Sequence, residues 1–176
     1  MAWFSRGKSS QDEVAEAAAS GPSRYPAPDE SLIGEDGLGP LRPKDRGLGD
    51  QERERVQSAL AALAADGTDV ADIGALSAAY DREYLAWRET RKKARANHDV
   101  IVEKYAIGLG EHLAGTTDLQ WRVVTDIFGT DLALADRREG DFVVVPGNLV
   151  ASRWMRGETG WLPGVARHLI GLRAST

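Results

Sequence analysis

Apolar residues spaced three and four apart predict three helices in the first half of the folded region. The first begins at Asp50, which is a good N-cap residue, and the second spans about residues 73–93. The third starts at Asn97 or Asp99 and ends at Gly115. Their predicted buried stripes contain Val56, Leu60 and Leu63; Ile73, Leu76, Tyr80, Tyr84 and Trp87; and Val102, Tyr105, Ala106, Leu109 and Leu113.

The period of the pattern then changes to two. Trp121, Val123, Thr125 and Ile127 alternate with Arg122, Val124 and Asp126. Gly129 supplies a turn, and Leu132 and Leu134 continue the pattern on a return strand, which predicts a β-hairpin. Residues 142–145 are apolar on both faces, as in a covered third strand. Two further helices are predicted at about residues 148–156 and 162–172. The stripe expected to be buried in the last helix contains Trp161, Val165, Leu169 and Leu172.

These elements predict an α+β domain. It has N-terminal helices, a three-stranded antiparallel β-meander, and two C-terminal helices packed on one sheet face. Residues 1–49 carry five of the seven prolines together with interspersed glycines, so we expect a flexible or extended segment there. Residues 50–176 form the single folded unit. Whether residues 30–49 lie extended against it stays open, because Leu32, Ile33, Leu38 and Leu41 are spaced along that stretch.

Composition narrows the classes of function. The 176 residues contain no cysteine, which excludes disulfides and thiolate chemistry and is typical of a reducing compartment, so we expect a cytoplasmic protein. A net charge of −5 argues against a nucleic-acid partner, since phosphate binding uses a concentrated positive field. No stretch approaches the roughly 20 apolar residues of a membrane-spanning helix, so no membrane span is expected.

Scattered glycines, aromatic residues and apolar positions between about residues 95 and 162 follow a known family pattern. The matching positions are Gly108, Gly110, Glu111, His112, Leu113, Trp121, Val123, Val124, Asp126, Gly129, Asp131, Val145, Pro146, Arg153, Trp154, Gly157 and Glu158. This set resembles a small bacterial domain of unknown function. The resemblance implies an uncharacterised member of that family, and it brings no assigned activity, cofactor or catalytic residue.

Motifs that would indicate a reaction are weak. Gly108 and Gly110 lie near the end of a predicted helix rather than before its start, so their amide groups do not form a phosphate cradle. His112 falls on a helix stripe, where we expect it to donate a hydrogen bond to a carbonyl group. The three histidines lack the spacing of common zinc motifs, and no Gly-x-Ser-x-Gly sequence occurs. The sequence therefore assigns no catalytic residue, metal site or cofactor.

Two surfaces are candidates for binding. A dense basic stretch near the end of the second helix could hold an anion or an acidic partner, although a solvated helix end is the simpler interpretation. Its residues are Arg88, Arg91, Lys92, Lys93 and Arg95. A second stretch combines residue types that are common in interface cores, although its tryptophans could instead pack on the sheet. Its residues are Arg153, Trp154, Met155, Arg156 and Trp161.

The sequence favours a non-enzymatic protein-interaction, adaptor or regulatory domain with an unidentified protein partner. A chaperone-type or immunity-type protein that masks a specific client is the alternative, by analogy with other small α+β modules. An enzyme or binder of a small anionic ligand comes third, because only the basic stretch supports it.

Overall fold

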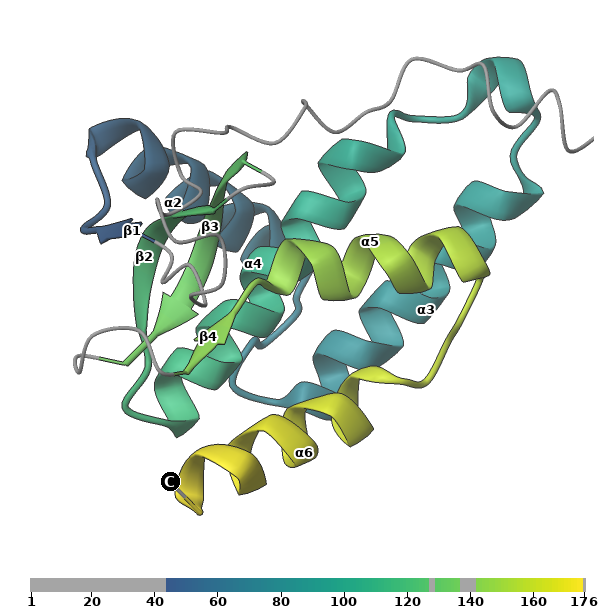
Figure 1. Cartoon of the computed structure of the whole chain (residues 1–176). Coiled ribbons are helices and arrows are strands. Elements are labelled where there is room, and N and C mark those ends of the chain that lie inside the picture. The colour runs from purple at the N-terminus through teal and green to yellow at the C-terminus, as the bar shows by residue number, and fades with distance from the viewer. Residues whose placement is uncertain (1–43, 127–128, 137–141, 176) are drawn as a thin grey trace, which may run out of the picture.

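The computed structural model describes residues 44–126, 129–136 and 142–175. Within these ranges the chain forms an α+β domain, as the sequence pattern predicts. Figure 1 shows the helices gathered beside a small antiparallel sheet. The elements are β1 (Lys44–Arg46), α2 (Asp50–Ala65), α3 (Ile73–Glu89), a 3₁₀ helix (Lys92–Ala94), α4 (His98–Thr116), β2 (Gln120–Asp126), β3 (Gly129–Ala135), β4 (Val143–Val144), α5 (Pro146–Arg156) and α6 (Leu162–Ala174).

The sheet has four strands in the order β1-β2-β3-β4, one more than predicted. The predicted hairpin is β2 and β3, and the short β4 pairs with the end of β3. The extra strand is β1, whose Lys44 pairs with Thr125 of β2. Residues 44–49 therefore belong to the folded domain, although the prediction placed them in the N-terminal segment. The rest of that segment lies outside the described residues.

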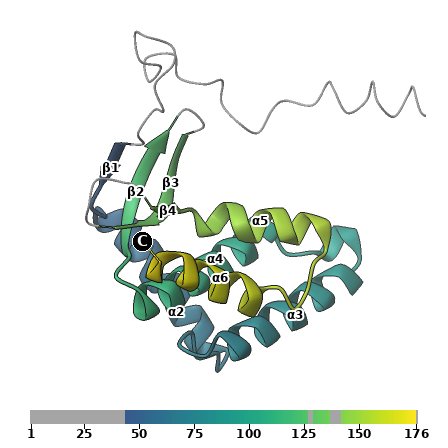
Figure 2. The same cartoon turned by 60° about the horizontal axis from the view of Figure 1, so that its bottom comes forward.

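Helix α4 lies at the centre and packs against α2, α3, α5, α6 and the hairpin. Helix α5 packs on α4 and on β3, in partial agreement with the prediction that the C-terminal helices cover one sheet face. Helix α6 differs, because it packs mainly along α3 and α4 (Figure 2). It reaches the sheet at its end, where the Arg173 guanidinium lies 3.3 Å from the buried Asp136 carboxylate.

Two glycines bring neighbouring elements against the α4 backbone. A Cβ atom at Gly108 would lie 2.8 Å from Leu63 Cδ1 of α2 and 2.9 Å from Leu76 Cδ1 of α3. A Cβ atom at Gly110 would overlap the indole ring of Trp121 on β2. The Trp121 ring is half-buried there, and its Nε1 donates to Glu111 Oε2 at 3.1 Å. Close packing, rather than turn formation, thus explains these helical glycines.

The helix boundaries differ from the prediction at several places, and α4 runs through Gly115 to Thr116 although the prediction ended it at Gly115. Gly49, not Asp50, is the N-cap of α2, and its N–H donates to Glu52 Oε2 at 2.8 Å. Helix α3 stops at Glu89 instead of continuing to Lys93, because Thr90 is extended with a ψ of 139°. Helix α5 begins at Pro146, which needs no N–H partner in the first turn.

The buried stripe of α6 also differs from the predicted one. Leu162 and Ala166 are its buried residues, whereas Leu172 is 45 % exposed. The predicted stripe was shifted because the helix meets α3 and α4 rather than a flat sheet. Across the described ranges, no helix is long and apolar enough to cross a membrane.

We expect Gly110→Ala to destabilise the domain by about 1–3 kcal/mol, because the new methyl group collides with Trp121. Gly115→Ala in the same helix is the matched control, since a Cβ atom there meets no atom within 4 Å. It should stabilise the domain by up to about 1 kcal/mol through helix propensity. Urea unfolding midpoints measure both changes. Equal midpoints for the two variants would contradict the close approach of β2 to α4.

A second prediction concerns the link between β1 and α2. The pKa of Glu52 is lowered to about 2, chiefly by the hydrogen bond that its carboxylate accepts from Arg46. The carboxylate therefore stabilises the fold fully above its ordinary pKa of about 4.5, and this contribution is lost as the pH falls through about 2. The melting temperature of Glu52→Gln should be slightly below that of the wild type at neutral pH. The difference between the two proteins should disappear in acid. A loss independent of pH would contradict a role for the charge.

Candidate functional site

Aromatic rings join the ends of α3 and α5. Tyr84 and Trp87 of α3 meet Trp154 of α5 with ring centroids 4.9 and 5.2 Å apart. Tyr80, one helical turn earlier, contacts both Trp154 and Trp161 at 5.8 Å. Spacings of three and four residues place the α3 rings on one face, so they present a continuous surface to α5. This aromatic cluster fixes the position of the α5 C-terminus against α3.

The cluster explains three of the five candidate partner-binding residues. Trp154 is 3 % exposed, so its ring belongs to the core and not to a surface. Its contacts are with α3 aromatic rings, in place of the sheet contacts considered from the sequence. Arg153 stacks over the Trp161 ring at 4.6 Å and donates to the Leu149 carbonyl at 3.3 Å. Trp161 is half-buried beneath it, so both side chains have structural contacts.

Met155 and Arg156 are the remaining two candidates, and both are exposed. Met155 is 72 % exposed, which is the largest exposure among the big apolar side chains of the described residues. Arg156 forms an ion pair with Glu158 at 2.6 Å. Met155 directly follows Trp154, whose ring contacts Trp87 near the end of α3.

Arg95 binds carbonyl groups at the C-terminal end of α3, so its guanidinium group is not available as an anion ligand. Its guanidinium group stacks over the Trp87 ring at 4.5 Å. It also donates to the carbonyl groups of Thr90 at 2.9 Å and Arg88 at 2.6 Å. The last carbonyl groups of a helix lack partners within the helix and carry partial negative charge, so an arginine there stabilises the helix end. Sequence spacing could not distinguish this role from anion binding.

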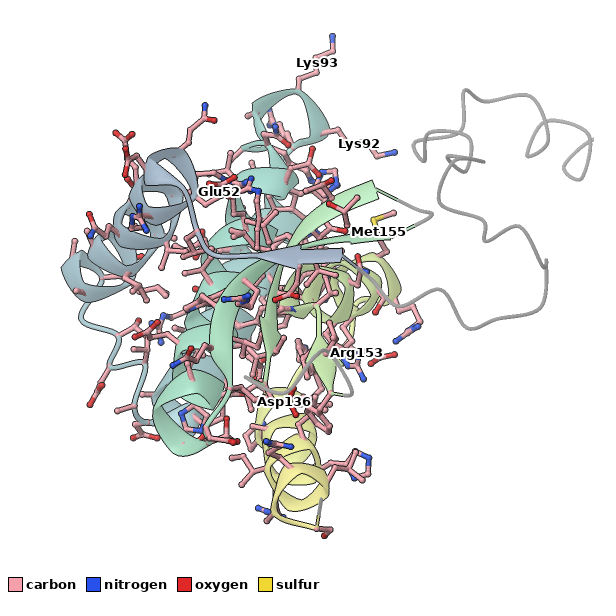
Figure 3. All side chains as sticks on the ribbon, turned by 60° about the vertical axis from the view of Figure 1, so that its left-hand side comes forward. Glu52, Lys92, Lys93, Asp136, Arg153 and Met155 are labelled. Atoms are coloured by element: carbon pink, nitrogen blue, oxygen red, sulfur yellow. The ribbon has the colours of Figure 1, made fainter. Side chains whose placement is uncertain are left out.

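The other four basic residues are exposed: Arg88, Arg91, Lys92 and Lys93. Within the described ranges no acidic side chain pairs with any of them. We call these four residues together with Met155 the cationic end. Figure 3 shows Lys92 and Met155 projecting from the same side of the molecule. The exposed members of the two candidate surfaces thus face the same side of the molecule, and the other members belong to packing.

A cavity of about 220 Å³ lies at the opposite end of α5. Its floor combines apolar residues of α4 and β3 with the start of α5, and its rim carries charged groups. On that rim, Arg55 of α2 pairs with Glu103 of α4 at 2.7 Å. The lining residues are Arg55, Asp99, Val102, Glu103, Ala106, Ile107, Trp121, Asp131, Leu132, Val145, Pro146 and Gly147. They come from α2, α4, the hairpin and α5, so sequence spacing gives no signal for this cavity.

Three polar side chains elsewhere in the fold, those of His112, Tyr105 and Lys104, have structural partners. His112 is 7 % exposed, and its Nδ1 lies 3.1 Å from the Val70 carbonyl oxygen, as the sequence predicts. The Tyr105 hydroxyl donates to Glu83 at 2.7 Å, and burial together with this bond raises the pKa of Tyr105 well above its usual range. Burial opposes the charge of Lys104, but its bonds to Glu83 and Asp66 outweigh that effect and raise its pKa.

These groups link helices and are not arranged as an acid–base pair. Glu83 of α3 accepts from Tyr105 and from Lys104 of α4, and Lys104 also reaches Asp66 after α2. A tyrosine with a raised pKa remains protonated near neutrality and does not act as a base. In the part of the chain that the structure describes, no three His, Cys, Asp or Glu residues are grouped so as to hold a metal ion.

Residues 81–163 match DUF3806, a domain of unknown function. The DUF3806 match confirms the resemblance to a domain of unknown function and begins within α3, earlier than the predicted residue 95. It includes the whole cationic end and every cavity-lining residue except Arg55. No curated protein and no solved structure matches the chain.

We expect Arg95→Lys to destabilise the domain by about 1–2 kcal/mol. A lysine keeps the charge but loses the stacked guanidinium plane and the fork that reaches two carbonyl groups. Lys92→Ala, three residues earlier, removes an exposed charge and should stay within about 0.5 kcal/mol of the wild type. Denaturant unfolding measures both. If Arg95→Lys were as stable as the wild type, Arg95 would be free to act as an anion ligand.

Proposed function

We propose that this protein is a protein-interaction module that binds an acidic surface of a partner through the cationic end. The observation that carries the proposal is a group of exposed basic residues with no acidic partner among the residues that the structure describes: Arg88, Arg91, Lys92 and Lys93. Four positive charges and one negative charge, that of Glu89, lie within the six residues 88–93 of a chain whose net charge is −5. Such a field attracts an acidic partner and speeds its association.

Exposed apolar area supports a protein as the partner. Met155 is 72 % exposed and Leu85 of α3 is 40 % exposed. Methionine is enriched in interface cores because its flexible side chain adapts to a partner surface. An apolar contact beside basic residues favours a folded or helical acidic segment over a free inorganic anion.

The use of Arg95 also favours a protein surface over a small anionic ligand. Arginine binds carboxylate or phosphate groups best through its two-pronged guanidinium fork. The fork of Arg95 is already occupied by the carbonyl groups of Arg88 and Thr90. The two lysines of the 3₁₀ helix act as point charges, which suit an extended acidic surface better than one tightly enclosed anion.

The test reverses the charge of the cationic end. Lys92→Glu with Lys93→Glu should abolish binding of a fluorescent peptide rich in aspartate and glutamate, as measured by anisotropy. The matched control is Arg82→Glu with Arg167→Glu, which makes the same change in net charge at two other exposed arginines. The control should retain binding, and added salt should weaken binding by the wild type. Equal loss in both variants would show a response to net charge alone and would refute the proposed surface.

A further inference from the structure

We propose a second docking site, at the cavity beside the start of α5, for a short segment of another protein that carries an apolar side chain flanked by basic residues. This site goes beyond the function proposed above, because it lies at the other end of α5 and has the opposite charge. Three properties of the cavity specify the occupant: its size, its charge and the groups on its walls.

The size of the cavity favours one anchoring side chain over a whole small molecule. Its volume of about 220 Å³ lies below the roughly 300–1,000 Å³ that is usual for drug-sized ligands. Arg55 and Glu103 also line a larger groove of about 460 Å³ between α2 and α4. The two hollows therefore share a border, and together they form an elongated concave surface. A peptide segment that anchors one side chain and continues along the groove fits this shape.

Charges at the rim select a basic segment. Arg55 and Glu103 neutralise each other through their ion pair at 2.7 Å. The carboxylate of Asp99 adds negative charge to the cavity lining, and the exposed Glu54 adds more along the groove, where the charge of Lys104 is already paired with Asp66 and Glu83. Lysine or arginine residues on either side of the anchor would lie near these carboxylates, which provides electrostatic complementarity.

The walls of the cavity suit a peptide chain in particular. Val102, Ala106 and Leu132 provide an apolar surface for the anchoring side chain. The first turn of α5 contributes Gly147, and no described side chain caps that helix start. Backbone N–H groups in a first helical turn have no partner within the helix and can donate to a peptide carbonyl oxygen. A peptide offers the apolar side chain, the carbonyl oxygen and the basic neighbours on one short segment.

A pair of proline–glycine helix starts provides a matched test. Gly147 follows Pro146 at the start of α5, and Gly164 follows Pro163 at the start of α6. A Cβ atom meets no atom within 4 Å at either glycine, so both helices accommodate a side chain. Gly147→Met places a side chain at the cavity wall, whereas Gly164→Met makes the same change on α6, which does not line the cavity. Thermal melts verify that both variants are folded.

The probes are short synthetic peptides with one leucine, methionine or phenylalanine between lysines, and the same peptides with glutamate in place of lysine. With the full-length chain, lysine peptides should bind saturably and shift the NMR signals of the Gly147 amide and the Trp121 indole N–H. Gly147→Met should weaken this binding by about tenfold or more, and Gly164→Met should leave it unchanged. Absence of binding, equal binding of glutamate peptides, or equal effects of the two variants would overturn the proposal.

The chain's own N-terminal residues could occupy the cavity in place of a partner protein. One measurement distinguishes these two occupants. The sequence contains no cysteine, so Leu38→Cys carries a single paramagnetic label. Broadening of the Gly147 signal by this label would assign the cavity to the chain itself and overturn docking of a partner; an unbroadened signal supports it. Lys92→Glu with Lys93→Glu should leave lysine-peptide binding intact, so the two docking sites succeed or fail independently.

Discussion

The fold depends on how closely α4 lets its neighbours approach. Gly108 admits leucines from α2 and α3, and Gly110 admits the Trp121 ring from β2. A side chain at either position would push one of these elements outward, because packed interiors leave no room for an added methyl group. The cavity takes residues from α2, α4, β3 and α5, so its shape follows from the same two contacts. Both glycines lie within the segment that matches DUF3806.

The sequence predicts the elements whose buried residues recur at a regular spacing. It misses the elements that are held by contacts with residues far away in the sequence. The stripes of α3 and α4 are buried at Tyr80, Tyr105 and Leu109 because an amphipathic pattern records which face meets the core. Strand β1 is only Lys-Asp-Arg and has no apolar alternation. It is held by pairing with β2 and by the ion pair between Asp45 and Arg122, 77 residues apart. No local rule detects such a partner.

In the two candidate surfaces, the sequence likewise does not show which single residues are buried by contacts with distant elements. Trp154 and Met155 are neighbours, yet one is 3 % and the other 72 % exposed. Residues one apart on a helix point in directions about 100° apart, and only the position of α3 decides which direction is inward. Arg95 and Lys93 likewise belong to one basic stretch. The carbonyl groups that Arg95 binds become available only because α3 ends at Glu89.

Helix α5 connects the two ends of the molecule that carry opposite charge. It begins at the cavity with Pro146 and ends beside Met155, and its 11 residues span about 16 Å. Contacts with α4 and the aromatic cluster hold it along its length, so the distance between the two surfaces is fixed. A basic segment at the cavity and an acidic surface at the cationic end would not compete, because each is repelled by the other's site. Two partners bound in this way would lie close enough to touch each other, which is the arrangement that an adaptor requires.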